Sequence, residues 1–151
     1  MEKEIYIGYN LKYGHKGYGS LKDYPKENII EMPIAENLMV GTAIGLAMEG
    51  FRPVVFFERF DFVLNGFDAI VNHLDKYFQY PVAIKIIIGS AKPLNPGVQH
   101  CQDYTEALKL MVKNIDIFES KSLVESQKIM NKYWKLKRPI IIIEKREIYN
   151  K

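Results

Sequence analysis

Six short apolar segments, separated by longer and more polar stretches, constrain the fold of this chain more than any other feature. They lie at residues 5–9, 29–32, 54–57, 82–88, 115–119 and 140–144. Their many β-branched and aromatic residues favour strands over helices. A continuous run such as the four isoleucines at 140–143 is typical of a strand that is buried on both faces, as in parallel sheets.

Segments with a helical period lie between several of these strands. In residues 65–78 the apolar positions are Phe67, Ile70, Val71, Leu74 and Phe78. In residues 122–136 they are Leu123, Ile129, Met130, Tyr133 and Trp134, and Ser122 stands where a helix N-cap is expected. Strands that alternate with helices predict an α/β fold, a mostly parallel doubly wound sheet with helices on both faces. We find no linker or repeat and expect residues 1–151 to form a single domain.

Composition and charge exclude several classes of protein. The chain has 151 residues, of which 48% are hydrophobic and 26% charged, as expected for one globular domain. Its net charge of +3 comes from scattered basic residues, which argues against nucleic-acid binding. The single cysteine, Cys101, cannot form an internal disulfide. No apolar run approaches the roughly 20 residues of a membrane span, so we expect a cytoplasmic protein without a membrane partner.

Two segments read as loops. Residues 13–25 contain three glycines in the order G-x-x-G-x-G, the reverse of a dinucleotide-binding fingerprint, and a surface loop is favoured over a phosphate-binding one. Residues 89–103 follow a strand and contain proline and glycine without any apolar period. Loops of this length in compact domains are usually functional, and this one should lie at the sheet edge where α/β proteins bind ligands.

Glu36 lies at the start of a glycine-containing apolar helix, residues 37–50. By itself, a carboxylate at this position is explained by the favourable charge of a helix N-terminus. Gly41 and Gly45 share one face of the helix, and because glycine lowers helix stability, they predict a close approach of a backbone or a ligand. Gly50 and Pro53 end the helix.

Several motifs in order along residues 29–103 resemble those of one enzyme family. They are P-I-A-E at 33–36, the glycine-spaced helix, G-F-R-P at 50–53, F-D-F at 60–62, F-D-A-I-V-N at 67–72 and Q-H-C-Q at 99–102. Together they are similar to the pyrimidine-binding domain of thiamine-diphosphate enzymes of the transketolase superfamily. The most similar pattern is that of the β-chain of the decarboxylating component of 2-oxo-acid dehydrogenase complexes. The resemblance implies the thiamine-diphosphate-binding fold.

The resemblance also implies roles for four residues. Glu36 corresponds to the acid that hydrogen-bonds the pyrimidine ring of thiamine diphosphate and promotes its reactive tautomer, for which the carboxyl group must be shielded from water. Phe62 corresponds to the aromatic residue that packs on this ring, and Phe60 belongs to the same aromatic motif. His100 corresponds to the histidine that faces the substrate.

Other polar residues are expected to be structural. His73 falls on the polar side of the helix expected at 65–78, and we assign neither it nor Cys101 a role in chemistry. We expect no metal ligand in this chain.

The resemblance covers only half of a thiamine site. No Gly-Asp-Gly motif occurs in the sequence, although the family uses one to hold Mg²⁺ and the diphosphate. The expected function is therefore the pyrimidine-binding half of a split enzyme that is inactive alone and acts on a 2-oxo acid or a sugar donor. A separate diphosphate-binding subunit would hold Mg²⁺, in an α2β2-type hetero-oligomer or around self-associated dimers of this chain.

Two alternatives remain at this stage. The chain could be a non-catalytic descendant of the fold with a role in assembly or regulation. It could also be a flavodoxin-like binding domain with its ligand on the loops at the carboxyl edge of the sheet, which a flavin spectrum of the purified protein would reveal.

Overall fold

A computed structural model of the chain, which describes residues 4–90 and 95–149, contains one six-stranded parallel sheet. The strands are β1 (Glu4–Gly8), β2 (Ile29–Glu31), β3 (Arg52–Phe57), β4 (Ala83–Ile88), β5 (Asp116–Ser120) and β6 (Ile140–Lys145). Their order across the sheet is β2-β1-β3-β4-β6-β5, and each neighbouring pair is parallel. All six predicted strands and the predicted α/β class are confirmed.

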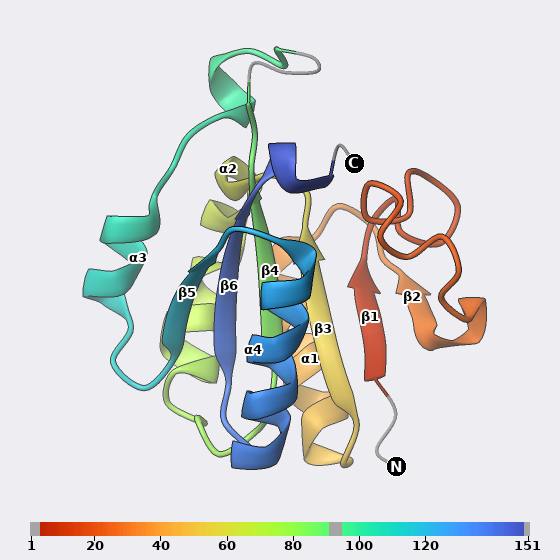
Figure 1. Ribbon diagram of the computed structural model, residues 1–151. Coiled ribbons are helices and arrows are strands. Elements are labelled where there is room, and N and C mark those ends of the chain that lie inside the picture. The colour runs from red at the N-terminus through yellow and green to blue at the C-terminus, as the bar shows by residue number, and fades with distance from the viewer. Residues whose placement is uncertain (1–3, 91–94, 150–151) are drawn as a thin grey trace.

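Helices cover both faces of the sheet (Figure 1). The α-helices are α1 (Glu36–Met48), α2 (Phe60–Val63), α3 (Thr105–Met111) and α4 (Leu123–Leu136). Short 3-10 turns occur at Lys26–Asn28, Leu64–Gly66, Val98–His100 and Arg146–Tyr149, and a π-helical segment at Ala69–Leu74. Within the part of the chain that the structure describes, no helix is both long and apolar enough to cross a membrane.

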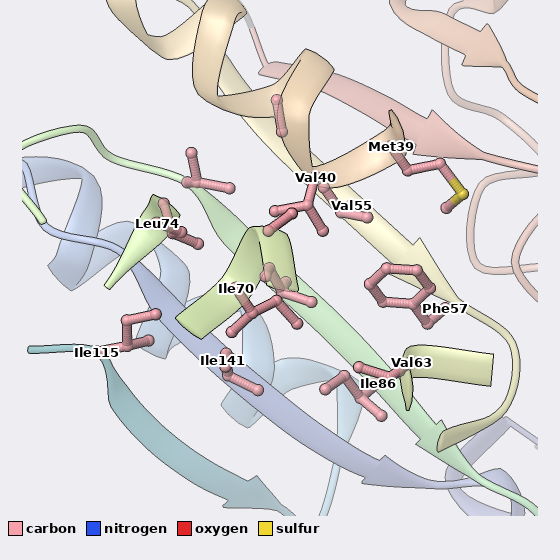
Figure 2. Packing of buried hydrophobic residues seen from close by; sticks show 14 of the residues in the cluster. Met39, Val40, Val55, Phe57, Val63, Ile70, Leu74, Ile86, Ile115 and Ile141 are labelled. Carbon is pink, nitrogen blue, oxygen red and sulfur yellow. The ribbon is translucent and has the colours of Figure 1, made fainter. Parts of the chain in front are cut away.

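Alternate strand residues point to opposite faces and build two hydrophobic clusters. Val55, Phe57 and Ile86 face α1 and the π-helical segment, as Figure 2 shows. On the other face, α4 inserts Met130 and Trp134 against a second set of strand side chains. Apolar groups are required on both sides of each central strand, which explains the continuous apolar runs in the sequence.

The segment 65–78 is not the single regular helix that its period predicts. A 3-10 turn is followed by the π-helical segment, in which the Asp75 N–H reaches back five residues to the Ile70 carbonyl oxygen at 2.9 Å. The wider turn changes which side chains share a face. Ile70 and Leu74 are fully buried as expected, whereas Phe78 lies beyond the segment and is 44% exposed.

The end of this segment is fixed by Asp75, a residue that no sequence pattern singled out. Its buried carboxylate accepts hydrogen bonds from the backbone N–H groups of Lys113 and Asn114, at 2.9 and 2.7 Å. Asp75 therefore ties the end of the π-helical segment to the connection between α3 and β5, and α3 itself was not predicted.

The N-cap of α4 is confirmed. The Ser122 hydroxyl accepts the Glu125 N–H at 3.1 Å, and the Glu125 carboxylate accepts the Lys121 N–H at 2.8 Å. Met130, Tyr133 and Trp134 are buried as expected, but Leu123 and Ile129 are only half-buried.

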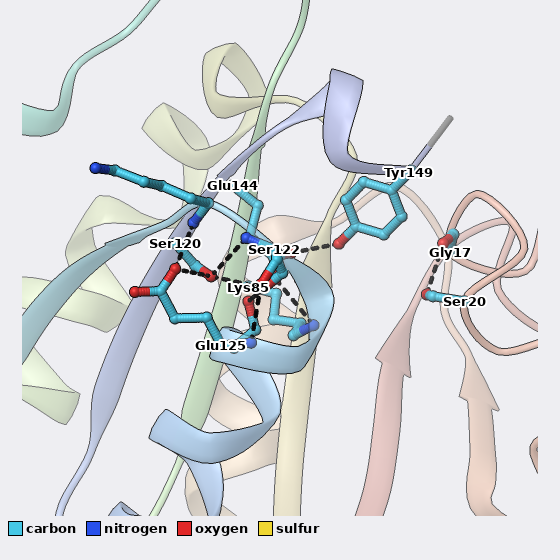
Figure 3. Close-up of polar contacts among 10 residues, drawn as sticks. Gly17, Ser20, Lys85, Ser120, Ser122, Glu125, Glu144 and Tyr149 are labelled. Carbon is cyan, nitrogen blue, oxygen red and sulfur yellow. Dashed lines mark hydrogen bonds and ion pairs between the residues drawn. The ribbon is translucent and has the colours of Figure 1, made fainter. Parts of the chain in front are cut away.

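A buried ion pair joins two neighbouring strands of the sheet (Figure 3). Lys85 on β4 lies 3.1 Å from the Glu144 carboxylate on β6. The same carboxylate accepts hydrogen bonds from the hydroxyl groups of Ser126 on α4 and Tyr149 near the C-terminus. Both oxygens of the Glu144 carboxylate therefore have partners. The network joins β4, β6, α4 and the last 3-10 turn.

Candidate functional site

The predicted site residues lie at the carboxyl edge of the sheet, around the crevice between β1 and β3. After β1 the chain turns toward β2 on one side, and after β3 it turns toward β4 on the other. Ligands of open α/β sheets bind at such a divergence. Glu36 begins α1 behind this crevice, Phe62 belongs to α2 just after β3, and His100 lies in the loop after β4.

Glu36 is shielded in the way that the proposed chemistry requires. It is the first residue of α1, yet its side chain is only 3% exposed. The 3-10 turn lies against it, because a Cβ on Gly66 would be in van der Waals contact with the Glu36 Cβ, at 3.4 Å. A carboxylate that served only the helix dipole would be expected in solvent. The burial of Glu36 therefore calls for a different explanation.

One oxygen of Glu36 has no partner among the described residues. Glu36 Oε1 is buried and accepts no hydrogen bond there. The residue lines an open cavity of about 690 Å³. The other lining residues are Ile34, Ala35, Asn37, Leu38, Gly41 and Asn65. An acceptor without a donor is costly when it is buried, so the unpaired Glu36 oxygen needs an explanation.

The structure brings Phe62 and His100 together. Their rings meet edge to face with centroids 5.3 Å apart. The backbone beneath them is tight, because a Cβ on Gly89 would lie 1.9 Å from the His100 carbonyl oxygen. Glycine is therefore required at position 89 for the loop to bring His100 against Phe62.

Tyr9 joins these rings, and sequence reasoning missed it. Its ring lies 6.2 Å from that of Phe62, and its hydroxyl group is buried without a hydrogen-bond partner in the described residues. Burial, followed by the negative charges of Glu58 and Glu36, raises the pKa of Tyr9 far above its usual range. The hydroxyl group therefore keeps its proton and is a donor. In the sequence, Tyr9 reads only as the last residue of an apolar strand.

Phe60 lies apart from this group. It is fully buried, and its ring packs edge to face on Tyr104 with centroids 5.6 Å apart. The first turn of α2 directs Phe60 and Val63 into the core, whereas Phe62 stays half-buried at the edge. Phe60 offers no surface to a ligand, and we leave it out of the proposed site.

The glycine-containing loop after β1 covers the same edge. The Glu31 carboxylate accepts the backbone N–H groups of Asn10 and Lys12, at 2.5 and 2.6 Å. Gly17 has φ 57° and Gly19 has φ 84°, values that favour glycine. Both lie in tight turns whose backbone N–H groups donate hydrogen bonds within the loop. The segment 13–25 was expected to be a surface loop, but Leu21 within it is buried.

Two residues, His73 and Cys101, were expected to be structural. His73 is exposed on the π-helical segment and lies 3.6 Å from the Asp68 carboxylate. Cys101 is a half-buried free thiol. Within residues 4–90 and 95–149, no three histidine, cysteine or acidic side chains gather in a way that could hold a metal ion.

Comparisons with known proteins agree with this fold. A family described as the transketolase pyrimidine-binding domain matches residues 11–151. The chain is 38% identical over 96 residues to the pyruvate dehydrogenase E1 component subunit beta of Leifsonia xyli, covering 59% of this chain and 28% of that protein. It is 30% identical to the same subunit of Chlorokybus atmophyticus, covering 99% of this chain and 48% of that protein. The chain thus spans less than half the length of these relatives.

Solved structures give the same fold. A split-gene transketolase, described as an inactive beta4 tetramer, superposes with a TM-score of 0.75 at 21% identity, covering 95% of this chain and 45% of that one. The transketolase of Campylobacter jejuni superposes with a TM-score of 0.74 at 17% identity, covering 93% of this chain and 22% of that one.

Proposed function

Because the chain belongs to the transketolase pyrimidine-binding domain family, we propose that it supplies the pyrimidine-binding half of a thiamine-diphosphate site whose other half lies on a separate subunit. Family members use thiamine diphosphate. The observation that carries the proposal is the buried Glu36 Oε1, which lacks a partner in the described residues and belongs to a residue that lines an open cavity.

The residues present fit the cofactor. A shielded carboxyl group suits a ring nitrogen that must share a proton, because water does not compete for the hydrogen bond. Phe62 is half-buried and can contribute an aromatic surface beside it. When bound, the cofactor supplies a thiazolium carbon that attacks a substrate carbonyl group after losing its proton.

The chain's own residues have separate tasks in this proposal. Glu36 holds the shared proton at Oε1 and keeps it away from solvent. Phe62 orients the ring and is itself in contact with the rings of Tyr9 and His100. His100, whose Nδ1 atom is buried and has no partner in the described part of the chain, faces the substrate and can donate or accept a proton there.

A partner subunit is part of the proposal. The sequence has no Gly-Asp-Gly motif, and the described residues contain no metal-binding cluster, so the diphosphate and Mg²⁺ would be held by another chain. The exposed face of α1 is the proposed contact. Nothing in the described structure lies within 4 Å of a Cβ placed on Gly41 or Gly45, so their close neighbour would come from another subunit. Ile34 and Leu38 are also exposed beside Glu36.

The reaction class follows from the relatives. The curated relatives are β subunits of pyruvate dehydrogenase, and the structural neighbours include transketolases. We therefore propose a carbonyl donor, either a 2-oxo acid or a sugar. The family match replaces the flavodoxin-like alternative, and the combined placement of Glu36, Phe62 and His100 favours a catalytic subunit over a purely structural descendant.

Reconstitution tests this function. The chain is mixed with a diphosphate-binding partner, thiamine diphosphate and Mg²⁺, and turnover is compared among wild type, Glu36→Gln and Glu49→Gln. Glu49 is an exposed acid at the other end of α1 and is the matched control. We expect Glu36→Gln to lower turnover by about 10²- to 10⁴-fold, the usual range for an acid-base group, and Glu49→Gln to leave it unchanged. Equal turnover of the three proteins would refute the assignment.

A further inference from the structure

Two hydrogen-bond donors at the β1–β3 crevice lack acceptors in the described residues. One is the Tyr9 hydroxyl group, on a side chain that is only 6% exposed, and the other is the Nε–H group of Arg59. Both atoms are buried. Buried donors in folded proteins are nearly always paired, so each calls for an acceptor from outside these residues.

The two donors belong to one neighbourhood. The pKa of Tyr9 is influenced by the Arg59 charge, and the Tyr9 ring contacts Phe62, which contacts His100. Arg59 also approaches the His100 loop, because its Cδ lies 3.4 Å from a Cβ placed on Gly89. The donors therefore flank the aromatic pair of the candidate site.

The other atoms of Arg59 are held in place. Its Nη1 donates to the Tyr18 hydroxyl and, at 2.6 Å, to the Glu58 carbonyl oxygen. Its guanidinium carbon lies 5.5 Å from the centre of the Tyr18 ring. These contacts fix the plane of the guanidinium group, so the Nε–H direction is set before any ligand arrives.

Two of the carboxylates near Arg59, those of Glu58 and Asp61, accept hydrogen bonds from other groups. His15 Nδ1 accepts the Tyr18 N–H at 3.0 Å, so His15 is the Nε2–H tautomer and donates to the Glu58 carboxylate. Asp61, the acid on α2, accepts the Gln102 N–H at 3.4 Å. Within the described chain, no hydrogen bond or ion pair joins a carboxylate to Arg59.

A second arginine lies close to Arg59. Arg146, from the turn after β6, lies over the same Tyr18 ring at 4.0 Å from its centre. Burial and then the Arg146 charge lower the pKa of Arg59. An added negative charge would offset both the burial of the guanidinium group and this repulsion.

We propose that Tyr9 and Arg59 bind an oxyanion, the carboxylate or phosphate group of the substrate, beside Phe62 and His100. An oxyanion supplies the acceptors that both donors lack and the charge that the two arginines favour. Its assignment to the substrate rests on the proposed function. The oxyanion site itself rests on residues of this chain alone.

The isolated chain tests the site directly, because the Arg59 Nε–H gives its own signal in ¹H–¹⁵N NMR spectra. The probes are acetate and inorganic phosphate, each titrated at constant ionic strength against chloride. We expect a saturable shift of the Arg59 signal with one or both probes. Saturation by acetate alone assigns the site to a carboxylate, and saturation by phosphate alone assigns it to a phosphate.

Variants separate specific binding from general charge. Arg59→Met should weaken binding by about tenfold or more, and Arg59→Lys, which keeps the charge but lacks the fixed N–H, should also weaken it. Tyr9→Phe keeps the ring and should weaken binding about three- to tenfold. Arg138→Met is the control, because Arg138 is exposed and its Nη2 donates to the Asn114 carbonyl oxygen. Spectra and melting curves of each variant verify the fold.

Two results would overturn the inference. The first is a linear, non-saturable shift with every anion, which would mean that water satisfies the donors. The second is binding that Tyr9→Phe and Arg59→Lys leave unchanged in folded protein. Neither result depends on thiamine diphosphate or a partner subunit. Failure of the oxyanion site is thus distinguishable from failure of the proposed function, which is read from Glu36-dependent turnover.

Discussion

Removal of the Lys85 ammonium group should destabilise the fold severely, because it leaves the Glu144 charge in the core without its cation. Lys85 Nζ lies 3.1 Å from Glu144 Oε1, and the two side chains are 8% and 0% exposed. Breaking a buried pair by removing one partner costs about 3–5 kcal/mol. Because a domain of this kind is stable by only about 5–15 kcal/mol, Lys85→Met should remain folded with a small margin.

Urea unfolding followed by tryptophan fluorescence measures this cost. The chain has one tryptophan, Trp134, which is 3% exposed and donates its Nε1–H to Glu4, so its emission reports on global unfolding. Glu144→Gln in the Lys85→Met background removes the unpaired charge and keeps an acceptor for Ser126 or Tyr149. The double variant should therefore be more stable than Lys85→Met by about 1–3 kcal/mol. A loss of unfolding free energy below about 1 kcal/mol in Lys85→Met would refute the reasoning. So would a double variant whose destabilisation equals the sum of those of Lys85→Met and Glu144→Gln.

Three further predictions concern α4 and α1. Ser122→Ala should lower the free energy of unfolding by about 1 kcal/mol, because the Glu125 N–H loses its cap; an unchanged urea midpoint would contradict the cap. Burial and the hydrogen bond to Asp116 raise the pKa of Tyr133 to about 12. Since the unfolded value is about 10, the folded state favours the protonated form. This stabilisation is complete below pH 10 and is lost as the pH rises from about 10 to about 12. The stability difference between wild type and Tyr133→Phe should therefore shrink across that window in urea titrations, and a constant difference would rule out the effect. Gly45→Leu should reduce the oligomer size in sedimentation experiments while the melting temperature of the monomer holds; the reverse pattern would mean that the glycines serve packing within the domain.

The fold could be predicted because its signals are local and agree with one another. Each buried strand needs apolar side chains on both faces, which produces runs such as 140–143. The cap at Ser122 depends on residues three positions apart, so it is visible in the sequence. The π-helical segment was not predictable in this way, because its extra residue per turn depends on how Asp75 is held by the distant amides of Lys113 and Asn114.

The candidate site was only partly accessible from the sequence. Glu36, Phe62 and His100 were found through their motifs, and the structure places the latter two in contact. Tyr9 and Arg59 carry no motif, and their interest comes from buried polar atoms that lack partners in the described residues. Phe60 belongs to the same motif as Phe62 but is not part of the site. The two residues are two positions apart on α2, and this places Phe60 in the core and Phe62 at the edge. The contact between Lys85 and Glu144 could not be predicted either, because it depends on the pairing of β4 with β6.

The most direct test of the central claim is the rate at which the thiazolium ring proton of bound thiamine diphosphate exchanges into deuterated water. Quenched-flow NMR on the reconstituted complex compares wild type with Glu36→Gln, whose amide has nearly the same shape but cannot share a proton. We predict exchange slower by at least about 10²-fold in the variant, with a melting temperature close to that of wild type. Equal exchange rates in the two proteins would show that Glu36 is no more than a buried carboxyl group at a helix end.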